Sequence, residues 1–451
     1  MHIRQLRIQN LACFDDVTLD FTNDEGKPCR WIVLLGENGT GKSTALRALI
    51  TGLPPEVIGR MAPPGTEFRT WLKGSRKCDI SIVAASDPGD IGHERRSLSW
   101  RSDVEDYPEG MRHGLATMGL NNVPYADRFP LDKGWFIVAY RPWRGGRRVV
   151  ETGDALNSYA IPAPREERVE SLFDNYDRLT LLREWLVDLD FRRLKETGRK
   201  QERADALYKL AISAIESIFP KKSIKIIGVT PTKDVILEED GVQVSISSLS
   251  DGYQSAMSWI GDLVRRLVEA FPENPLHAHG VVLLDEIDLH LHPSWQRSIV
   301  NQIRDVFPNL QFIVTTHSPF IAQDMTADDK IIVLKRDGNR ITVTEDKGFV
   351  QGWRVDQILT SYLFGLSDTR GQGVEDQEKT RRDLLDRRAQ NGLSADEQET
   401  LARVNSFIAN IKSSPEEKLG ADEPTDADLR RAANDILQIL AKRQLRPAGR
   451  K

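Results

Sequence analysis

The sequence of 451 residues contains little cysteine and no long apolar run. Cys13, Cys29 and Cys78 are its only cysteines, and an odd, sparse set without C-x-x-C spacing argues against a disulfide framework and a cysteine-ligated zinc site. No apolar run approaches the roughly 20 residues that a membrane-spanning helix needs. The first residues alternate charged and apolar side chains, so they lack the apolar segment of a secretory signal. We therefore expect a reduced, cytoplasmic protein that does not contact a membrane.

Charge of one sign is not in excess either. The 62 Lys and Arg residues against 67 Asp and Glu residues give a net charge of −5, which does not indicate a binder of nucleic acid along its whole length. Hydrophobic residues make up 39% and charged residues 29%, which is typical of a soluble chain that forms a core. At roughly 100–200 residues per domain, the length allows two or three domains.

The strongest motif is a phosphate-binding loop at residues 36–43, GENGTGKS, which matches G-x-x-x-x-G-K-[ST]. It lies between a predicted buried strand and a predicted helix, and this context disfavours a Gly-rich turn without function. Glycines let backbone N–H groups surround phosphates, and the N-terminus of the helix adds partial positive charge. The motif predicts that Lys42 reaches the β- and γ-phosphates and that the Ser43 hydroxyl ligates Mg²⁺. The residues expected to bind nucleotide here are Gly36, Asn38, Gly39, Thr40, Gly41, Lys42, Ser43 and Thr44.

A second motif is an apolar segment, residues 280–284, that ends in Asp285 and Glu286. A strand here would place Asp285 beside the phosphate-binding loop, where its carboxylate can hold Mg²⁺. Glu286 follows one residue later and suits a base that polarises the attacking water. The alternative, an acidic strand end that caps the next helix, is disfavoured by the presence of the loop.

Histidines form a third signal. His317 directly follows a predicted strand in the sequence TTHSP, residues 315–319, and can donate a hydrogen bond to the γ-phosphate. An isolated histidine is more often structural, but the position after the Asp-Glu strand favours the functional interpretation. His290 and His292 are close together, yet without a nearby cysteine a metal site is disfavoured.

The fourth motif, LSDGYQ at residues 249–254, precedes a predicted helix. With the other three it resembles the ATP-binding-cassette ATPases of the SMC, RecF and OLD type over roughly residues 1–346. The resemblance implies a head-to-tail dimer around two ATP molecules, in which Ser250 and Gly252 of one subunit bind the γ-phosphate held by the other. One loop and one signature motif per chain then require at least a homodimer.

Within that family, residues 285–296, DEIDLHLHPSWQ, and the TTHSP motif are most similar to small bacterial AAA-type ATPases, such as the ATPase subunits of the antiphage defence systems Septu and PARIS. This implies that residues 288–292 cross the dimer interface as the D-loop. The sequence departs from the transporter pattern in having Asp251 where a glycine stands. It also offers no clear Q-loop glutamine near Tyr140 and Arg141, where that loop is expected.

The order of elements predicts an α/β fold, a P-loop NTPase of the ABC or SMC-head type with a short helical-hairpin insertion and a helical C-terminal region. Leucines at helical spacing on either side of Gly198 indicate the hairpin. Ser394 with Glu397 has the spacing of a capping box at a helix start. The expected parts are an N-terminal ATPase part with the P-loop at 1–160, the hairpin at 161–222, a second ATPase part at 223–346 and the helical region at 347–451.

These patterns favour an enzyme that hydrolyses ATP to ADP and phosphate with ATP and Mg²⁺ bound, as a homodimer or higher homo-oligomer. The C-terminal region shows no catalytic pattern, so we expect any effector chemistry to lie on a separate protein, a nuclease or toxin. The ATP state of this chain would regulate that effector in bacterial antiphage defence. Two alternatives stay open: a RecF-like DNA-binding ATPase of repair or recombination, and a nucleotide-locked scaffold. The candidate nucleic-acid contacts are Arg141, Arg144, Arg147 and Arg148.

Overall fold

The computed structural model forms two compact units, Met1–Leu366 and Ser367–Lys451. The described residues are 1–53, 77–85, 98–105, 117–118, 136–142, 178–220, 224–239, 241–338, 340–346, 350–366, 369 and 371–410. None of the helices within these ranges is both long and apolar enough to cross a membrane.

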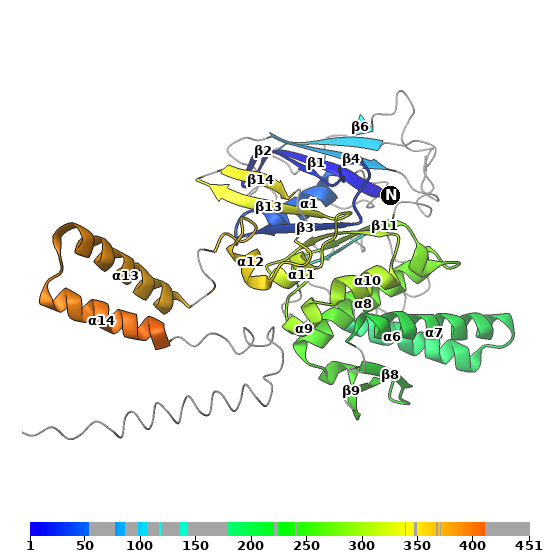
Figure 1. The fold of residues 1–451 in the computed structure, drawn as a ribbon. Coiled ribbons are helices and arrows are strands. Elements are labelled where there is room, and N and C mark those ends of the chain that lie inside the picture. Colours follow the sequence, from blue (N-terminus) through cyan, green and yellow to red (C-terminus); the bar gives the residue numbers. More distant parts are fainter. Residues whose placement is uncertain are drawn as a thin grey trace, which may run out of the picture. The chain divides into compact units, whose positions relative to one another are not determined.

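The centre of the first unit is a six-stranded sheet in the order β14-β13-β3-β12-β11-β7 (Figure 1). Neighbouring strands from β13 to β7 are parallel, and β14 pairs antiparallel with β13. The carboxyl ends of the parallel strands therefore meet at one edge. The strands are β3 (Trp31–Gly36), β7 (Ile137–Tyr140), β11 (Gly280–Leu284), β12 (Leu310–Thr315), β13 (Lys330–Asp337) and β14 (Arg340–Asp346).

A second, antiparallel sheet has the order β2-β1-β4-β5-β6, and helix α1 (Lys42–Gly52) lies between the two sheets (Figure 1). Successive strand residues point to opposite faces of a sheet. Accordingly, Ile32 and Leu34 pack toward α1 and the antiparallel sheet, whereas Val33 faces the helices on the other side. The antiparallel strands are β1 (His2–Leu11), β2 (Phe14–Asp20), β4 (Lys77–Ala85), β5 (Leu98–Glu105) and β6 (Thr117–Met118).

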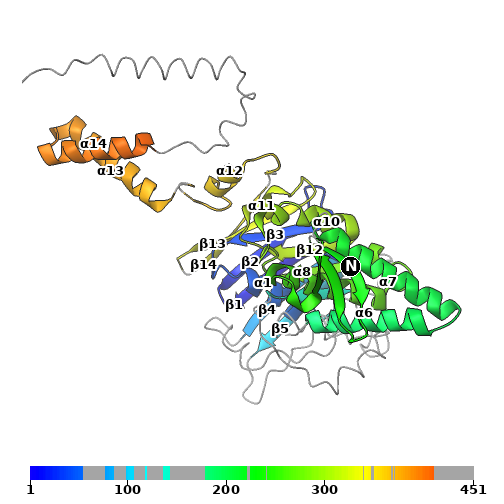
Figure 2. The same ribbon diagram turned by 90° about the horizontal axis from the view of Figure 1, so that it is seen from below.

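Helices cover the other face of the parallel sheet, and a small sheet β10-β9-β8 packs with them. The paired helices α6 and α7 run side by side in the view from below (Figure 2). These elements are α6 (Arg178–Lys195), α7 (Arg199–Ile218), β8 (Ile224–Val229), β9 (Val235–Glu239), β10 (Val242–Ser245), α8 (Asp251–Ala270), α9 (Pro293–Gln296), α10 (Ile299–Val306), α11 (Pro319–Gln323) and α12 (Val355–Thr360), with short 3₁₀ turns Ile246–Ser248 and Pro275–His277.

A buried polar network joins the parallel sheet to α8. The Tyr140 hydroxyl donates to Asp262 Oδ2 at 3.1 Å, and Arg265 and Arg266 both form ion pairs with the same buried carboxylate. The backbone carbonyl of Tyr140 accepts from the N–H of Asp285 at 2.9 Å. Tyr140 thus connects the strand end that carries Asp285 with the helix that begins at the signature motif.

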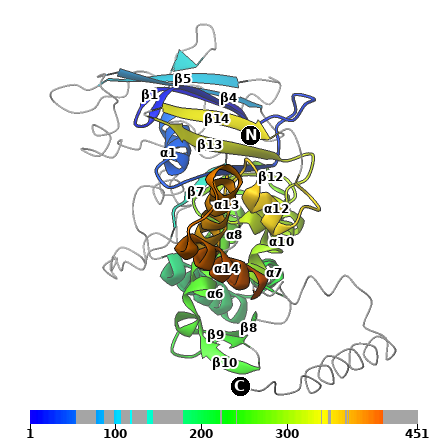
Figure 3. The ribbon, with the colours of Figure 1, turned by 60° about the vertical axis from the view of Figure 1, so that its left-hand side comes forward.

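The second unit contains the antiparallel helices α13 (Gln372–Asn391) and α14 (Ala395–Asn410), which are orange to brown in Figure 3. The predicted capping box is present: Glu397 N–H donates to Ser394 Oγ at 3.3 Å, and Ser394 N–H donates to Glu397 Oε2 at 2.9 Å. Residues 350–366, which the sequence pattern assigns to the C-terminal region, group with the first unit because Ile358 and Leu363 are buried in its core.

The sheet, with the phosphate-binding loop between β3 and α1, confirms the predicted α/β P-loop NTPase fold. The predicted break in the helical hairpin at Gly198 is present, where the backbone takes a φ of +63°. Leu194, one of the leucines at helical spacing before Gly198, is 64% exposed at the end of α6. Residues 293–306 form two helices, α9 and α10, because the backbone leaves helical values at Ser298.

Candidate functional site

The phosphate-binding loop is closed around the Lys42 side chain. Lys42 Nζ donates to the backbone carbonyls of Gly36 at 2.7 Å and Glu37 at 2.9 Å. The pKa of Lys42 is lowered mainly because burial disfavours its charged form, while the carboxylate of Asp285 opposes that shift. The amine is thus held within the loop by backbone carbonyls of the loop itself.

Two glycines of the loop leave no room for a side chain. A Cβ on Gly36 would lie 2.4 Å from the carbonyl oxygen of Leu334, and a Cβ on Gly41 would lie 2.5 Å from Cys13 Sγ. Both glycines also have positive φ, +150° and +92°, which side chains disfavour. The loop therefore packs directly against the end of β13 on one side and the β1–β2 turn on the other.

A chain of hydrogen bonds connects the loop to the ends of β11 and β12. The Ser43 hydroxyl donates to Asp285 Oδ1 at 3.0 Å, and the Thr315 hydroxyl donates to the same oxygen at 2.6 Å. The N–H of Glu286 donates to the Thr315 hydroxyl at 2.7 Å. The structure thus brings together Ser43, Asp285 and Glu286, as the sequence predicts, and adds Thr315 as the residue that joins the Asp285 carboxylate to the backbone of Glu286.

Thr315 lies in the predicted TTHSP motif, but no sequence pattern assigns it this role. Thr315→Val should raise the Mg²⁺ concentration that gives half-maximal turnover by about 10- to 100-fold. Residues that orient a metal ligand have effects of this size on metal affinity, and the sequence predicts Asp285 as that ligand. The measurement is ATP turnover titrated with Mg²⁺. Thr344→Val, an exposed threonine on β14, should leave the titration unchanged. Equal Mg²⁺ titrations for Thr315→Val and the wild type would contradict the role of Thr315.

His317 lies two residues after the end of β12, at the same edge of the sheet as the loop. The backbone N–H of His317 donates to Asp288 Oδ1 at 3.4 Å, and the Thr316 hydroxyl donates to the same oxygen. The pKa of His317 is lowered because the surrounding protein desolvates the imidazole and because the Lys42 ammonium is near. The imidazole is therefore neutral at pH 7 and carries one N–H that can donate.

A cleft of about 300 Å³ borders the loop. Its lining comes from the loop, from His317, from the end of β13 and from the segment after α12. The lining residues are Gly36, Glu37, Thr40, His317, Val333, Leu334, Lys335, Arg336, Leu363, Phe364 and Gly365. The sequence motifs locate the first four of these residues but not the last seven.

The signature motif forms a separate pocket of about 230 Å³ at the start of α8. Exposed Ser250 is the N-cap residue of α8, and its hydroxyl caps no backbone N–H of the helix. Gly252 packs so closely on residue 290 that an added Cβ would lie 2.3 Å from the carbonyl oxygen of His290. His290 and His292 also line this pocket, which shares no lining residue with the cleft at the phosphate-binding loop.

Of the candidate nucleic-acid contacts, Arg141 follows β7, and Arg144, Arg147 and Arg148 lie outside the described residues. No cluster of three or more His, Cys, Asp or Glu side chains that could hold a metal ion occurs in the described part of the chain. His290 and His292 therefore have no third ligand of this kind there.

Comparison with known sequences places this site in a family. Residues 32–322 match the family described as "AAA domain, putative AbiEii toxin, Type IV TA system". The chain is 26% identical over 379 residues to the Septu protein PtuA of Bacillus mycoides (strain KBAB4). This alignment covers 81% of this chain and 45% of that protein. It is 25% identical over 424 residues to the Retron Ec83 probable ATPase of Escherichia coli, which covers 80% of this chain and 76% of that protein. The chain thus spans less than half the length of the first relative and about three quarters of the second.

Solved structures include two distant neighbours. An SMC head bound to the C-terminal winged-helix domain of ScpA aligns with a TM-score of 0.46 and 14% identity, over 77% of this chain and 98% of that one. The SMC head domain from Thermotoga maritima aligns with a TM-score of 0.42 and 14% identity, over 77% of this chain and all of that one. The family match covers well over half of the chain and includes the phosphate-binding loop, the Asp-Glu strand and His317. The chain belongs to the family of AAA domains described as putative AbiEii toxin, Type IV TA system.

Proposed function

We propose that the chain is an ATPase that binds ATP and Mg²⁺ between two subunits and, through this bound state, regulates a separate effector protein in antiphage defence. The observation that carries the proposal is the hydrogen-bonded chain from Ser43 through Asp285 and Thr315 to Glu286. This chain connects the phosphate-binding loop to two oxygen ligands suited to Mg²⁺, those of Ser43 and Asp285, and to the residue that carries the neighbouring Glu286 carboxylate. Phosphoryl transfer to water requires groups of these kinds.

The residues of the site fit a magnesium ion. Ser43 Oγ and Asp285 Oδ1 lie 3.0 Å apart and are oxygen ligands of the kind that Mg²⁺ prefers. These two residues would hold the ion, which neutralises phosphate charge when bound. Lys42 would bind the β- and γ-phosphates, and the backbone amides of the loop would bind the remaining phosphate oxygens.

Glu286 would orient and polarise the attacking water. Its backbone is fixed by the hydrogen bond from its N–H to Thr315 and adopts a φ of +56°, so the carboxylate starts from a constrained position. His317, neutral at pH 7, would donate a hydrogen bond to the γ-phosphate. Each of these groups is placed at the carboxyl ends of neighbouring parallel strands, where ligands bind in α/β sheets.

The separation of the two pockets supports an arrangement in which Ser250 and Gly252 act on the nucleotide of a second subunit. Within the described residues the loop and the signature motif line different pockets, so each chain contributes two half-sites. The names of the relatives, a Septu protein and a retron probable ATPase, support a role in defence.

Mixing two inactive variants tests the shared site. Lys42→Ala disables the phosphate-binding loop of its own chain, and Ser250→Arg blocks the signature motif with a bulky, exposed side chain. In a mixed population half of the dimers are heterodimers, and each contains one intact composite site. We expect turnover to recover to about a quarter of the wild-type value in a closed two-fold dimer.

Each variant alone should show only background turnover, and each should retain the thermal unfolding midpoint of the wild type. A site built within one chain would give no recovery on mixing. That result would overturn the shared-site arrangement while leaving the nucleotide-binding loop in place.

A further inference from the structure

The cleft beside the phosphate-binding loop has a basic wall that the sequence motifs do not include. Lys335 and Arg336 lie at the carboxyl end of β13, and both line the cleft together with Glu37 and His317. Strand β13 is the parallel neighbour of β3, with Leu334 paired to Gly36. The two cations therefore begin one and two residues beyond the level at which the loop itself begins.

The side chains of these two residues are exposed and form no ion pair within the described residues. Other cations of the same strand pair are neutralised: Lys330 pairs with Glu345 at 2.9 Å, and Arg340 pairs with Asp15 at 3.4 Å. Among the residues that the structure describes, two adjacent cations without an ion-pair partner in the lining of this cleft are therefore a local feature and do not reflect a generally basic surface.

Their distance from the loop is fixed by close packing. Neighbouring strands lie about 4.8 Å apart, which is within the length of a lysine or arginine side chain. The backbone of Leu334 touches Gly36 so closely that a Cβ there would lie 2.4 Å from the Leu334 oxygen. The pairing of β13 with β3 and this close approach together hold Leu334 beside the first glycine of the loop.

Carboxylates near the loop give the site negative charge, which added cations would balance. Asp285, Glu286 and Asp288 all act electrostatically on Lys42 and His317, so the end of the site near His317 is rich in negative charge. A γ-phosphate adds further negative charge at this end. Lys335 and Arg336 line the same cleft as His317 and add positive charge there.

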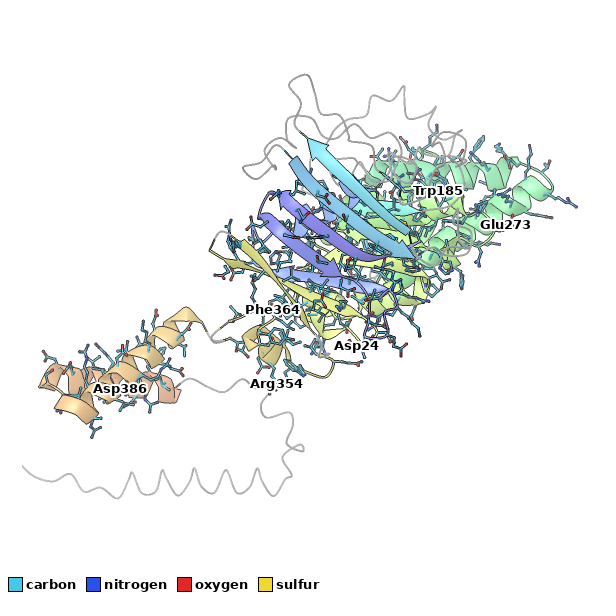
Figure 4. The ribbon with its side chains drawn as sticks, turned by 90° about the horizontal axis from the view of Figure 1, so that it is seen from above. Asp24, Trp185, Glu273, Arg354, Phe364 and Asp386 are labelled. Carbon is cyan, nitrogen blue, oxygen red and sulfur yellow. The ribbon has the colours of Figure 1, made fainter. Side chains whose placement is uncertain are left out.

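Part of the cleft lining is apolar. Leu363, buried in the core, and half-buried Phe364 line it after the end of α12; Phe364 is labelled in Figure 4. Apolar walls exclude water and lower the local dielectric, which strengthens charge interactions in the space between them. The cleft thus pairs two cations with a surface that favours their contact with a bound anion.

We propose that Lys335 and Arg336 are further phosphate-binding residues, which contact the γ-phosphate of a nucleotide held by the loop of the same chain and so distinguish a triphosphate from a diphosphate. This inference rests on the proposed ATP site. It assigns selectivity for the third phosphate to the end of β13, in addition to Lys42 and His317.

The test compares two nucleotides on the full chain by calorimetric titration: AMP-PNP with Mg²⁺ and ADP with Mg²⁺. The double variant Lys335→Ala/Arg336→Ala should bind AMP-PNP about 10- to 100-fold more weakly than the wild type, because hydrogen bonds to charged groups have effects of this order. Its affinity for ADP should change by less than about threefold, since ADP lacks the group contacted. In turnover, KM for ATP should rise more than kcat falls.

Arg340→Ala is the matched control, because it removes a cation from the neighbouring strand that does not line the cleft. It should leave both affinities unchanged, and the exchange Lys335→Arg/Arg336→Lys should retain most of the preference for AMP-PNP. Thermal unfolding of each variant reports whether the fold is intact.

The inference is overturned if the double variant keeps the wild-type ratio of the two affinities, or if Arg340→Ala lowers AMP-PNP affinity equally. In both cases Lys42→Ala still separates the two proposals, because it must abolish binding of both nucleotides if the loop is the site. A wild-type chain that binds neither nucleotide would overturn the proposed function and this inference together.

Discussion

Glu286→Gln should retain ATP and accumulate as a nucleotide-bound dimer, while turnover falls by about 10²–10⁴-fold, the usual contribution of a general base. Glutamine keeps the size of the side chain and removes its negative charge. The backbone hydrogen bond from residue 286 to Thr315 does not involve the side chain, so the position of the residue should be preserved. Loss of the base would then block the step that lets the two subunits separate.

Two measurements check this expectation: phosphate release under saturating ATP, and molar mass by light scattering with ATP and Mg²⁺. Glu273→Gln replaces an exposed glutamate that lies outside the site, labelled in Figure 4, and should behave as the wild type. Normal turnover by Glu286→Gln would remove the assignment of Glu286 as base. Slow turnover with no increase in molar mass would remove the dimer.

Lys42→Ala should abolish detectable binding of ATP and ADP alike. Lys42 donates to two loop carbonyls, and the bound phosphates would take over these charge-assisted contacts. Losing two such hydrogen bonds at about 1.5–3 kcal/mol each corresponds to an affinity loss of about 10²–10⁴-fold. Direct binding of both nucleotides, followed by calorimetry, gives the readout.

The matched control for this change is Lys27→Ala. It removes an exposed lysine that pairs with Glu25 and does not line the cleft at the loop. It should leave both affinities as in the wild type. Because Lys42 is buried, a comparison of thermal unfolding without nucleotide is needed beside the titration. A Lys42→Ala chain that folds and still binds ADP tightly would contradict the placement of the β-phosphate.

The central strands of the parallel sheet could be predicted from the sequence because their signals are local. Strand β3 is a continuous apolar run that precedes the glycines of the loop, and β11 is an apolar run that ends in two carboxylates. Helix α1 follows from the same motif. By contrast, the interruption at Ser298 is set by the packing of α9 and α10 around Trp295, whose indole N–H donates to Ile218 O at 3.1 Å, and no nearby residue signals it.

The site, too, has residues that local motifs predict and residues whose roles depend on long-range strand pairing. Motifs locate Lys42, Ser43, Asp285 and Glu286, and the structure brings them to one edge of the sheet. The role of Thr315 depends on the register between β11 and β12, which pairs Leu284 with Val314. The contribution of β13 depends on its pairing with β3, from a segment almost 300 residues away in sequence. Long-range register of this kind leaves no trace in a local pattern.

Helix α1 is packed between two sheets, and the loop before it touches backbone or side chains on both flanks. The amides that would surround phosphates are consequently ordered during folding and not upon binding, so little conformational entropy is lost when a nucleotide arrives. Association should then be fast and of similar rate for diphosphate and triphosphate. Discrimination between them would appear in how long each remains bound.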